Sequence, residues 1–304
     1  MNVIYYAIPG FLLCLALEAL WARRAARAGA PVRGEGGRAT GARVVGYEGR
    51  DTAASLAMGV GYLFISLGTK AFTFALMLWL WQHRIFDLPR AWWAWALLLV
   101  AEDFCYYWFH RTHHQVRLLW AAHVNHHSST HYNLSTALRQ SWTTPFTSPV
   151  FWLPLPLLGF HPTWVVAQQA VSLLYQFWLH TESVGSLGPL ERVLNTPSHH
   201  RAHHGSNAEY IDRNHGGIFI VWDRLFGTFE PERAAVTYGL TKNVESFHPA
   251  RIAFHEWRDL ARDVAGARDL GEALRYAFGR PGWAPPRHAP PAEAGGALAR
   301  EALP

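Results

Sequence analysis

The sequence predicts an all-α integral membrane protein with about four spanning helices, some paired as a hairpin, and a cytoplasmic helical cap that holds a histidine-rich dimetal site. Three observations support this fold class. Half of the 304 residues are hydrophobic and only 16% are charged, whereas soluble domains carry about 25% charged residues. Fifteen Trp suit a membrane interface, where one end of the ring is apolar and the other is wet. Many of the eighteen His recur in clusters of one spacing.

The first apolar segment predicts an N-terminal membrane anchor over residues 1–22. Its residues 3–22 are long enough to cross a bilayer, because about 20 apolar residues span the hydrocarbon core. No basic segment precedes it and no small-residue cleavage site ends it, so we expect it to stay uncleaved. Residues 23–52 predict a flexible basic loop, since residues 23–50 hold seven Arg against two Glu. The positive-inside rule places this loop in the cytoplasm.

The next apolar segments predict the remaining spans. Residues 53–83 favour one tilted helix, and residues 91–109 favour a second one. Residues 143–179, interrupted at His161-Pro162, favour a hairpin that enters the membrane and returns. Counting crossings from an external N-terminus then places every dense histidine cluster on the cytoplasmic side. Two helices in residues 53–83 would reverse that result.

The C-terminal part is more polar. Residues 181–279 predict a cytoplasmic cap with a helix near 250–278, which completes a membrane and catalytic domain over residues 53–279. Residues 280–304 are rich in Pro, Ala and Gly, and they predict a disordered tail.

Charge and cysteine content exclude two classes of protein. The net charge of +5 would suit a nucleic acid, but the basic residues cluster beside apolar segments. Anionic headgroups and membrane orientation explain that placement better, so we expect no nucleic-acid partner. The two cysteines, Cys14 and Cys105, lie inside apolar stretches, which argues against both a disulfide framework and a cysteine metal site.

Three boxes share the pattern His-x-x-His-His, at residues 110–114, 123–127 and 200–204. On a helix, His110 and His114 share one face and can meet at one metal. Within each box the first and second histidines are three residues apart, whereas we expect the third to point elsewhere. One box can therefore reach two neighbouring metals.

The number of imidazoles indicates two ions. Structural zinc takes four ligands and catalytic zinc takes three plus water, so eight boxed histidines exceed the needs of one ion. Imidazole binds Fe, Zn, Cu and Ni alike, and the ligand type does not name the metal. Other histidines are expected to be structural or interfacial, namely His83, His113, His131, His161, His199, His248 and His288.

Several stretches resemble the fatty acid hydroxylase/sterol desaturase superfamily of membrane di-iron enzymes. Among them are EDFCYYWFHR, LLYQFWLHTE, LNTPSHHRAHHGSN and IDRNHGGIFIVWDRLFGTFE. The likeness covers roughly residues 101–258, about half of the chain. Within the superfamily, the stretches most resemble the branch that cleaves ether lipids.

The resemblance implies a metal-ligand set of nine histidines. These are His110, His114, His123, His126, His127, His180, His200, His203 and His204. It further implies two iron ions, O2 and an external reductant, either tetrahydrobiopterin or a ferredoxin-type donor protein. The implied activity is that of a membrane non-haem di-iron monooxygenase, which hydroxylates a C–H bond of a membrane lipid and, on an alkylglycerol, cleaves the ether. The Arg- and Ala-rich composition favours a bacterial inner membrane, with the site facing the cytoplasm, and the oligomeric state stays open.

Two other functions remain open at this point. One is a sterol, fatty-acyl or carotenoid hydroxylase or desaturase with the same metal ligands. The other is a histidine-rich metal transporter, although its ligands should lie near the bilayer midplane on facing helices. The chain departs from the ether-lipid branch at Gln115 and Thr130, where that branch has acidic residues, and at His215, where it has tyrosine. These departures leave the ligand set intact, and they leave the reductant and the lipid open.

Polar residues near the boxes are candidates to hold the imidazoles in place. A ligating imidazole usually donates its other N–H to a carboxylate or a carbonyl. The candidates are Asp103, Asn133, Glu182, Asn207, Asp212, Asn214 and Asp223. Helix capping or a surface salt bridge is the alternative role for each of them. No catalytic residue beyond the metal site is assigned.

Overall fold

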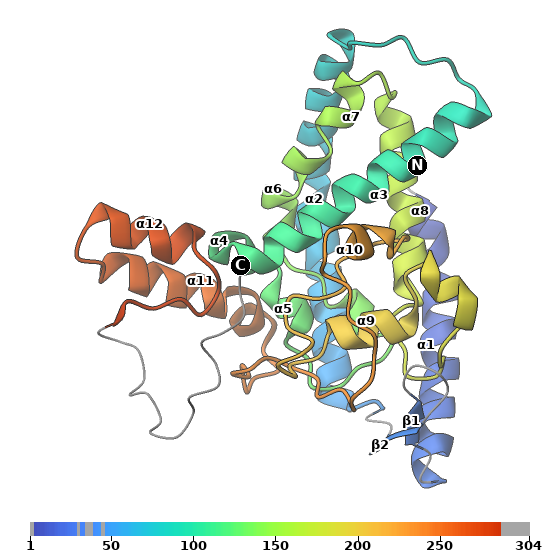
Figure 1. Ribbon diagram of the computed structural model, residues 1–304, viewed down its shortest axis with the longest axis vertical. Coiled ribbons are helices and arrows are strands. Elements are labelled where there is room, and N and C mark those ends of the chain that lie inside the picture. The colour runs from blue at the N-terminus through green and yellow to red at the C-terminus, as the bar shows by residue number, and fades with distance from the viewer. Residues whose placement is uncertain (1–2, 29–30, 34–38, 44–45, 287–304) are drawn as a thin grey trace.

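The computed structural model describes residues 3–28, 31–33, 39–43 and 46–286 (Figure 1). Apart from one antiparallel pair of strands, β1 (Pro31–Arg33) and β2 (Ala39–Arg43), the named elements of this part of the chain are helices joined by turns and loops. The helical class is therefore confirmed, but the expectation of a flexible loop throughout residues 23–52 is wrong. Short strands that pair with each other satisfy their backbone groups locally and leave little pattern in the sequence.

Two long helices match the first two predicted spans. Helix α1 (Val3–Arg27) continues past the expected end of the anchor, and α2 (Gly49–Gln82) is one unbroken helix. At 1.5 Å per residue α2 is about 51 Å long, more than a bilayer core requires. Only 17% of the residues in the most apolar stretch of α1 and 11% of those in α2 are buried, and side chains such as Phe64 and Phe72 are exposed. Apolar surface of this extent is typical of helices that face lipid.

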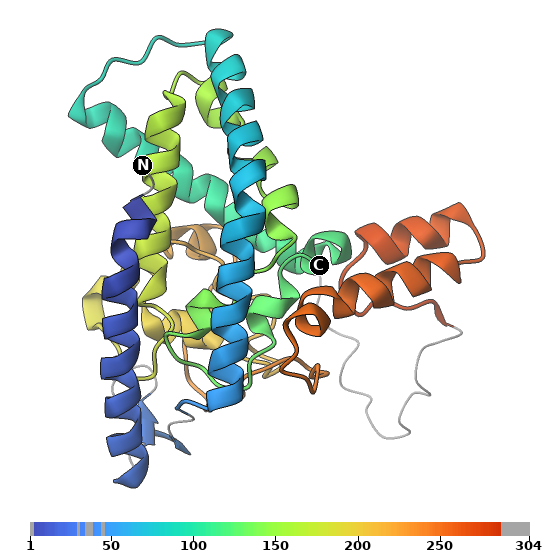
Figure 2. The ribbon, with the colours of Figure 1, turned by 180° about the vertical axis from the view of Figure 1, so that it is seen from behind.

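Helix α3 (Trp92–Gln115) is longer than the predicted span and carries the first histidine box in its last turns. Figure 1 shows α3 crossing the molecule obliquely, whereas α1, α2 and α8 run roughly parallel to one another. Figure 2 gives the same arrangement from behind. Helix α8 (Pro162–Phe177) packs against α3 and forms the returning arm of the predicted hairpin.

The entering arm of that hairpin is not a continuous helix. It consists of α6 (Thr144–Thr147), η3 (Pro149–Phe151) and α7 (Pro154–Leu157). A proline lies within the first turn of each piece, and proline inside a longer helix would remove a hydrogen bond and clash with the preceding turn. The prolines therefore divide this arm into single turns.

Two apolar clusters hold the long helices together. In one, Met77 of α2 and Leu98 of α3 pack with Trp152, Leu155 and Val165, which belong to the hairpin. The other cluster joins Leu15 of α1, Leu134 and Ala137 near η2 (Thr136–Leu138), and Phe177 of α8. The second cluster fixes the end of α8, from which the chain enters the histidine-rich region.

The remaining elements are short and surround the boxes. They are α4 (Arg117–Trp120), α5 (Val124–His127), η4 (Gly188–Arg192), α9 (Pro197–His203) and α10 (Val221–Leu225).

The helix predicted near 250–278 is two helices, α11 (Pro249–Ala265) and α12 (Leu270–Phe278), which project as a hairpin from one side of the molecule (Figures 1 and 2). Gly266 ends α11, and the Asp269 side chain caps α12 by accepting from the Glu272 amide. Most of the predicted disordered tail, residues 287–304, lies outside the described residues.

Candidate metal centre

The fold brings all nine candidate histidines together in two groups. The first group holds His110, His114, His123, His127 and His203, and the second holds His126, His180, His200 and His204. Within each group the candidate ligand nitrogens lie within 4.8 Å of one another. The contributing elements are the end of α3, the short helices α5 and α9, and the segment after α8.

The second and third boxes each serve both groups, as expected for a box that reaches two metals. The expected meeting of His110 and His114 is confirmed, because both lie in the first group, but the expectation that the third histidine of a box points away from the first is wrong. His123 lies in the first group with His127, and His200 lies in the second group with His204. The second histidine of each of these boxes lies in the other group: His126 in the second and His203 in the first. At 3.6 residues per turn, residues four apart differ by about 40° around the helix and residues three apart by about 60°. The closer alignment is therefore the one between the first and third histidines of a box.

Several imidazole nitrogens face one another directly. In the first group, His123 Nε2 lies 3.2 Å from His110 Nε2 and 3.2 Å from His127 Nε2. In the second, His180 Nε2 lies 3.1 Å from His126 Nε2 and 3.0 Å from His200 Nε2. Each nitrogen carries a lone pair unless it is protonated, so this convergence concentrates lone pairs around two points.

Other nitrogens in the two groups are buried without a hydrogen-bond partner among the described residues. They include Nε2 of His114, His203 and His204. Leaving a buried polar atom unsatisfied costs about 1–3 kcal/mol, and native structures contain few such atoms. Convergent orphaned imidazole nitrogens fit a bound cation, because each would then have a partner.

Burial keeps these imidazoles neutral at physiological pH. It lowers the pKa of His123, His127 and His204 well below the ordinary histidine value, and neighbouring imidazoles lower these pKa values further. Burial also lowers the pKa of His203 to about 4. Neutral imidazole is the form that ligates a metal, so the site needs no proton release from these side chains at pH 7.

Backbone carbonyls hold the outer nitrogens of three imidazoles. The Nδ1–H of His110 donates to the His215 carbonyl at 2.9 Å, and that of His203 donates to the Arg213 carbonyl at 2.7 Å. The Nδ1–H of His180 donates to the Gln176 carbonyl at 3.0 Å. A carbonyl can only accept, so each bond fixes the tautomer and leaves the Nε2 lone pair for the interior of the group.

The loop that supplies two of these carbonyls has an unusual backbone. Asp212 and Asn214 adopt positive φ angles of 58° and 56°. Asp and Asn tolerate the left-handed region better than most residues. The Asp223 carboxylate accepts from the backbone N–H groups of His215 and Gly216 at 2.7 and 2.8 Å. These features aim the carbonyls of residues 213 and 215 at the first group.

One of the polar candidates lies beside a grouped imidazole. The Asp212 carboxylate is 3.8 Å from His114 Nδ1. Asp223 acts through the backbone of His215, as described above.

The other candidates form hydrogen bonds with backbone segments. Asp103 accepts from the amides of Ile218 and Phe219, and Asn133 donates to the Gly46 carbonyl. Glu182 accepts from the Gly46 amide. Asn207 donates to the Ala235 carbonyl and accepts from the Thr237 amide. Asn214 donates to the carbonyls of His199 and Glu230.

The histidines beside the boxes take other positions. The His113 Nδ1–H donates to the Phe109 carbonyl, and its Nε2 lies 2.9 Å from the Thr147 hydroxyl, which ties α3 to α6. The His199 ring packs against Phe229 at a centroid distance of 5.3 Å. Sequence reasoning missed His215, which is fully buried beside the first group. Its signal was the Asn214-His215-Gly216 stretch, where histidine replaces the tyrosine of the resembling enzymes.

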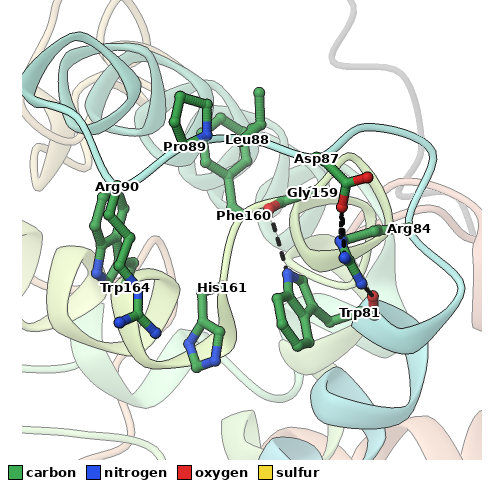
Figure 3. Close-up of a pocket in the computed structure, with 10 residues that line it drawn as sticks. All are labelled: Trp81, Arg84, Asp87, Leu88, Pro89, Arg90, Gly159, Phe160, His161 and Trp164. Atoms are coloured by element: carbon green, nitrogen blue, oxygen red, sulfur yellow. Dashed lines mark hydrogen bonds and ion pairs between the residues drawn. The ribbon is translucent and has the colours of Figure 1, made fainter.

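A separate cavity of about 110 Å³ lies at the other end of α2, between residues 84–90 and the turn before α8 (Figure 3). Trp81 donates to the Gly159 carbonyl at 3.3 Å, and Arg84 pairs with Asp87 at 2.7 Å. None of the nine grouped histidines lines this cavity. It is therefore not the candidate metal centre.

The fold and the two histidine groups define a helical membrane protein with a histidine-rich candidate metal site. Residues 95–228 match the family model described as Fatty acid hydroxylase, a range that includes all nine grouped histidines. The similarity to this family therefore covers the part of the chain that holds the candidate metal centre.

Curated relatives agree with this similarity. The chain is 42% identical over 239 residues to alkylglycerol monooxygenase of Homo sapiens, which covers 77% of this chain and 53% of the relative. It is 43% identical over 237 residues to the Danio rerio enzyme of the same name, with the same two coverages. The ornithine lipid hydroxylase OlsE of Rhizobium tropici is 28% identical over 176 residues, 57% of this chain and 53% of that protein. The chain thus spans about half the length of these relatives, and no solved structure matches it.

Proposed function

We propose that the nine grouped imidazoles hold two iron ions, and that the protein uses O2 and an external reductant to hydroxylate a C–H bond of a membrane lipid. The observation that carries this proposal is the division of the histidines into two adjoining groups of five and four. Either group alone satisfies one ion, and imidazole suits iron. The names of the similar proteins, monooxygenase and hydroxylase, support an oxidative reaction over a structural metal site.

The chain positions the imidazole ligands and excludes bulk water from the site. Backbone carbonyls orient His110, His180 and His203 before any metal binds. Burial keeps bulk water from the lone pairs and strengthens every electrostatic interaction inside the site. Bound iron would supply the activation of O2 by two electrons, a chemistry that side chains lack.

The favoured substrate is an alkylglycerol ether lipid, because four of the similar proteins are named alkylglycerol monooxygenase. Hydroxylation of the O–CH2 carbon consumes O2, two electrons and two protons, and it releases water. The product is a hemiacetal, which breaks into an aldehyde and a glycerol derivative. The electron donor is either tetrahydrobiopterin or a ferredoxin-type protein.

Hydroxylation or desaturation of another lipid, such as a sterol, a fatty acyl chain or a carotenoid, is the second candidate. The similarity to an ornithine lipid hydroxylase and to the fatty acid hydroxylase vlmA supports it. A metal transporter fits less well. The grouped histidines follow the ends of α3 and α8 and lie buried among short helices, rather than on facing helices at a membrane midplane.

The proposed arrangement in the membrane is multi-pass. Helices α1, α2 and α3 and the hairpin that ends in α8 would form the spans, in a bacterial inner membrane. The domain would run over residues 53–279, with the metal site in a cytoplasmic cap. The Arg-rich segment of residues 23–50 and the exposed apolar surfaces of α1 and α2 support this orientation.

Comparative lipidomics tests the proposed function. Cells with the wild-type chain or with His126→Ala would be grown in air and supplied with an isotope-labelled alkylglycerol. We expect labelled aldehyde, or the corresponding acid, from the wild type alone, and none under anaerobic conditions. Equal products from both chains would defeat the proposal. A lipid that gains oxygen and keeps its alkyl chain would instead favour the second candidate.

A further inference from the structure

Helix α12 carries an uncovered apolar stripe, formed by Leu270, Leu274 and Phe278 and called the α12 stripe below. These residues are four apart, so they differ by only about 40° around the helix. Their exposed fractions are 74%, 47% and 58%. Glu272 and Tyr276 of the same helix are buried. Residues two apart differ by about 200°, so the α12 stripe lies on the face opposite the buried one.

The buried face anchors α12 beside the first histidine box. The Tyr276 ring lies 5.9 Å from the guanidinium of Arg117, which begins α4 three residues after that box. The Arg117 amide donates to the Gly279 carbonyl at 3.0 Å, directly after α12. The same arginine pairs with Glu256 and Asp263 of α11, at 2.8 and 2.7 Å. These contacts hold both helices of the hairpin, so the α12 stripe cannot turn inward.

The free charges beside the α12 stripe are basic. Arg268 and Arg275 are exposed and form no ion pair with a carboxylate of the described residues. The acidic Glu272 is buried, and the Asp269 carboxylate accepts from its amide as the cap of α12. An apolar stripe bordered by arginines is typical of a helix that lies in a membrane interface, where the cations meet anionic headgroups.

The arrangement of the helices agrees with such a contact. Figures 1 and 2 show the hairpin running roughly across the direction of α2, with α12 on the side of α11 toward the end of α2 at Gln82. The part of α2 that leads to Gln82 carries exposed side chains such as Phe64 and Phe72. Helix α12 is thus the helix of the hairpin that lies nearer the level of the lipid-facing surface.

We propose that the α12 stripe inserts into the cytoplasmic leaflet, at the boundary between headgroups and acyl chains, and that Arg268 and Arg275 contact anionic lipid phosphates. This inference rests on the proposed arrangement of the protein in the membrane. Burial of the three apolar side chains removes their contact with water, and the arginines keep the helix at headgroup depth. Because the hairpin is anchored at Arg117, the contact also fixes the depth of the first histidine box below the lipid surface.

The accessibility of a spin label tests the inference without measuring activity. The full chain, with Cys14→Ser and Cys105→Ser, would be labelled at Leu274→Cys and placed in phosphatidylcholine nanodiscs with or without phosphatidylglycerol. Oxygen concentrates among lipid tails, whereas a polar nickel chelate stays in water. We expect oxygen to relax the label more than nickel does, and phosphatidylglycerol to increase this preference. Arg268→Gln with Arg275→Gln should remove most of the increase.

Arg258 of α11 gives the matched controls, because its side chain is 64% exposed on the other helix of the hairpin. A label at Arg258→Cys should favour nickel, and Arg258→Gln should leave the effect of phosphatidylglycerol unchanged. A label at Phe72→Cys reports the span itself and should favour oxygen.

The two proposals fail in different ways. If the label at residue 274 favours nickel while the label at residue 72 favours oxygen, the inference is overturned and the membrane arrangement stands. A label at residue 72 that favours nickel defeats the arrangement itself. Shielding of residue 274 from both probes shows that protein covers the α12 stripe, and this also overturns the inference. A preference for oxygen that does not depend on phosphatidylglycerol overturns the role of the two arginines.

Discussion

Arg201 and Glu232 form a fully buried ion pair through two hydrogen bonds, of 2.9 and 2.7 Å, between the guanidinium and the carboxylate. Arg201 lies within the third histidine box on α9 and also donates to the carbonyls of Thr181 and Val184. It therefore ties the helix that carries His200 and His203 to the segment that carries His180. Arg201, which lies between the first two histidines of the third box, therefore has a structural role.

Glu232→Gln should lower the free energy of unfolding by about 3–5 kcal/mol, because it removes the carboxylate that pairs with the buried Arg201 guanidinium. Thermal unfolding in detergent, followed by circular dichroism, measures the effect. The control is Asp259→Asn, which removes surface pairs with Arg258 and Arg262 and should cost less than about 1 kcal/mol. If both variants unfold at the same temperature, the buried pair does not stabilise the site as we infer.

The wild-type chain, purified without oxygen, should carry about two iron ions per chain, since each histidine group satisfies one ion. His126→Ala removes a nitrogen from the second group, and His203→Ala removes one from the first. Each should lower the iron content and abolish turnover. Elemental analysis and product formation are the measurements, with the remote His83→Ala as the control. Full activity in either group variant would contradict the ligand assignment.

Asp223→Asn should weaken metal binding by about 10–100-fold, the usual cost of disturbing groups that orient ligands. The carboxylate accepts from two backbone N–H groups of the loop whose carbonyls hold His110 and His203, and an amide nitrogen would oppose one of them. Competition with a chelator measures the affinity. Asp269→Asn, which can still cap the distant α12, should bind metal like the wild type. Equal affinities in the two variants would show that the loop does not orient the ligands.

Local signals in the sequence predicted much of the fold. The apolar run of residues 53–83 is one helix, and the prolines of residues 143–160 mark the broken arm. The repeated box predicted that its histidines would meet, because covalent spacing and helical geometry act over a few residues. The first and third histidines of each box share a group, as expected for His110 and His114, whereas the third histidine was expected to point elsewhere.

The groups that hold the imidazoles were harder to predict. Polar side chains were the candidates, but three backbone carbonyls accept from the imidazoles. Every residue has a backbone carbonyl, so the sequence does not mark the ones that bind. Their direction depends on the positive φ angles of Asp212 and Asn214 and on Asp223, which acts across the loop. His215 appeared as a departure from the resembling enzymes, and only its tertiary contacts place it beside the first group.

Reporter insertions test the proposed topology. A reporter after Arg50 and one after Gly205 should both report the cytoplasm, and one near His161 should report the opposite face. The reasons are the Arg excess in residues 23–50 and the single long helix α2, which counts as one crossing between Arg50 and residues 84–90. An insertion in the exposed α11–α12 turn at Arg268 serves as a further cytoplasmic control. Opposite locations for residues 50 and 205 would contradict the proposed arrangement of spans.

The last prediction concerns the way in which the lipid reaches the site. The histidine groups adjoin helices with exposed apolar surfaces, so we expect the alkyl chain to enter from the bilayer. A methylene gains about 0.8 kcal/mol on leaving water, but almost nothing on moving from lipid into a protein channel. Binding should therefore depend weakly on chain length, and the oxidised carbon should be set by where the polar head stops.

Alkylglycerols shortened by two, four and six carbons would be incubated with the enzyme, and the products identified by mass spectrometry. Oxidation should stay at the same carbon counted from the glycerol, with similar KM values. Phe177→Ala, which widens the apolar surface three residues before His180, should change KM for all chain lengths and leave that carbon unchanged. If oxidation instead keeps a fixed distance from the methyl end, the head does not position the chain. The protein then acts as a hydroxylase of fatty-acyl or carotenoid chains rather than of an ether bond.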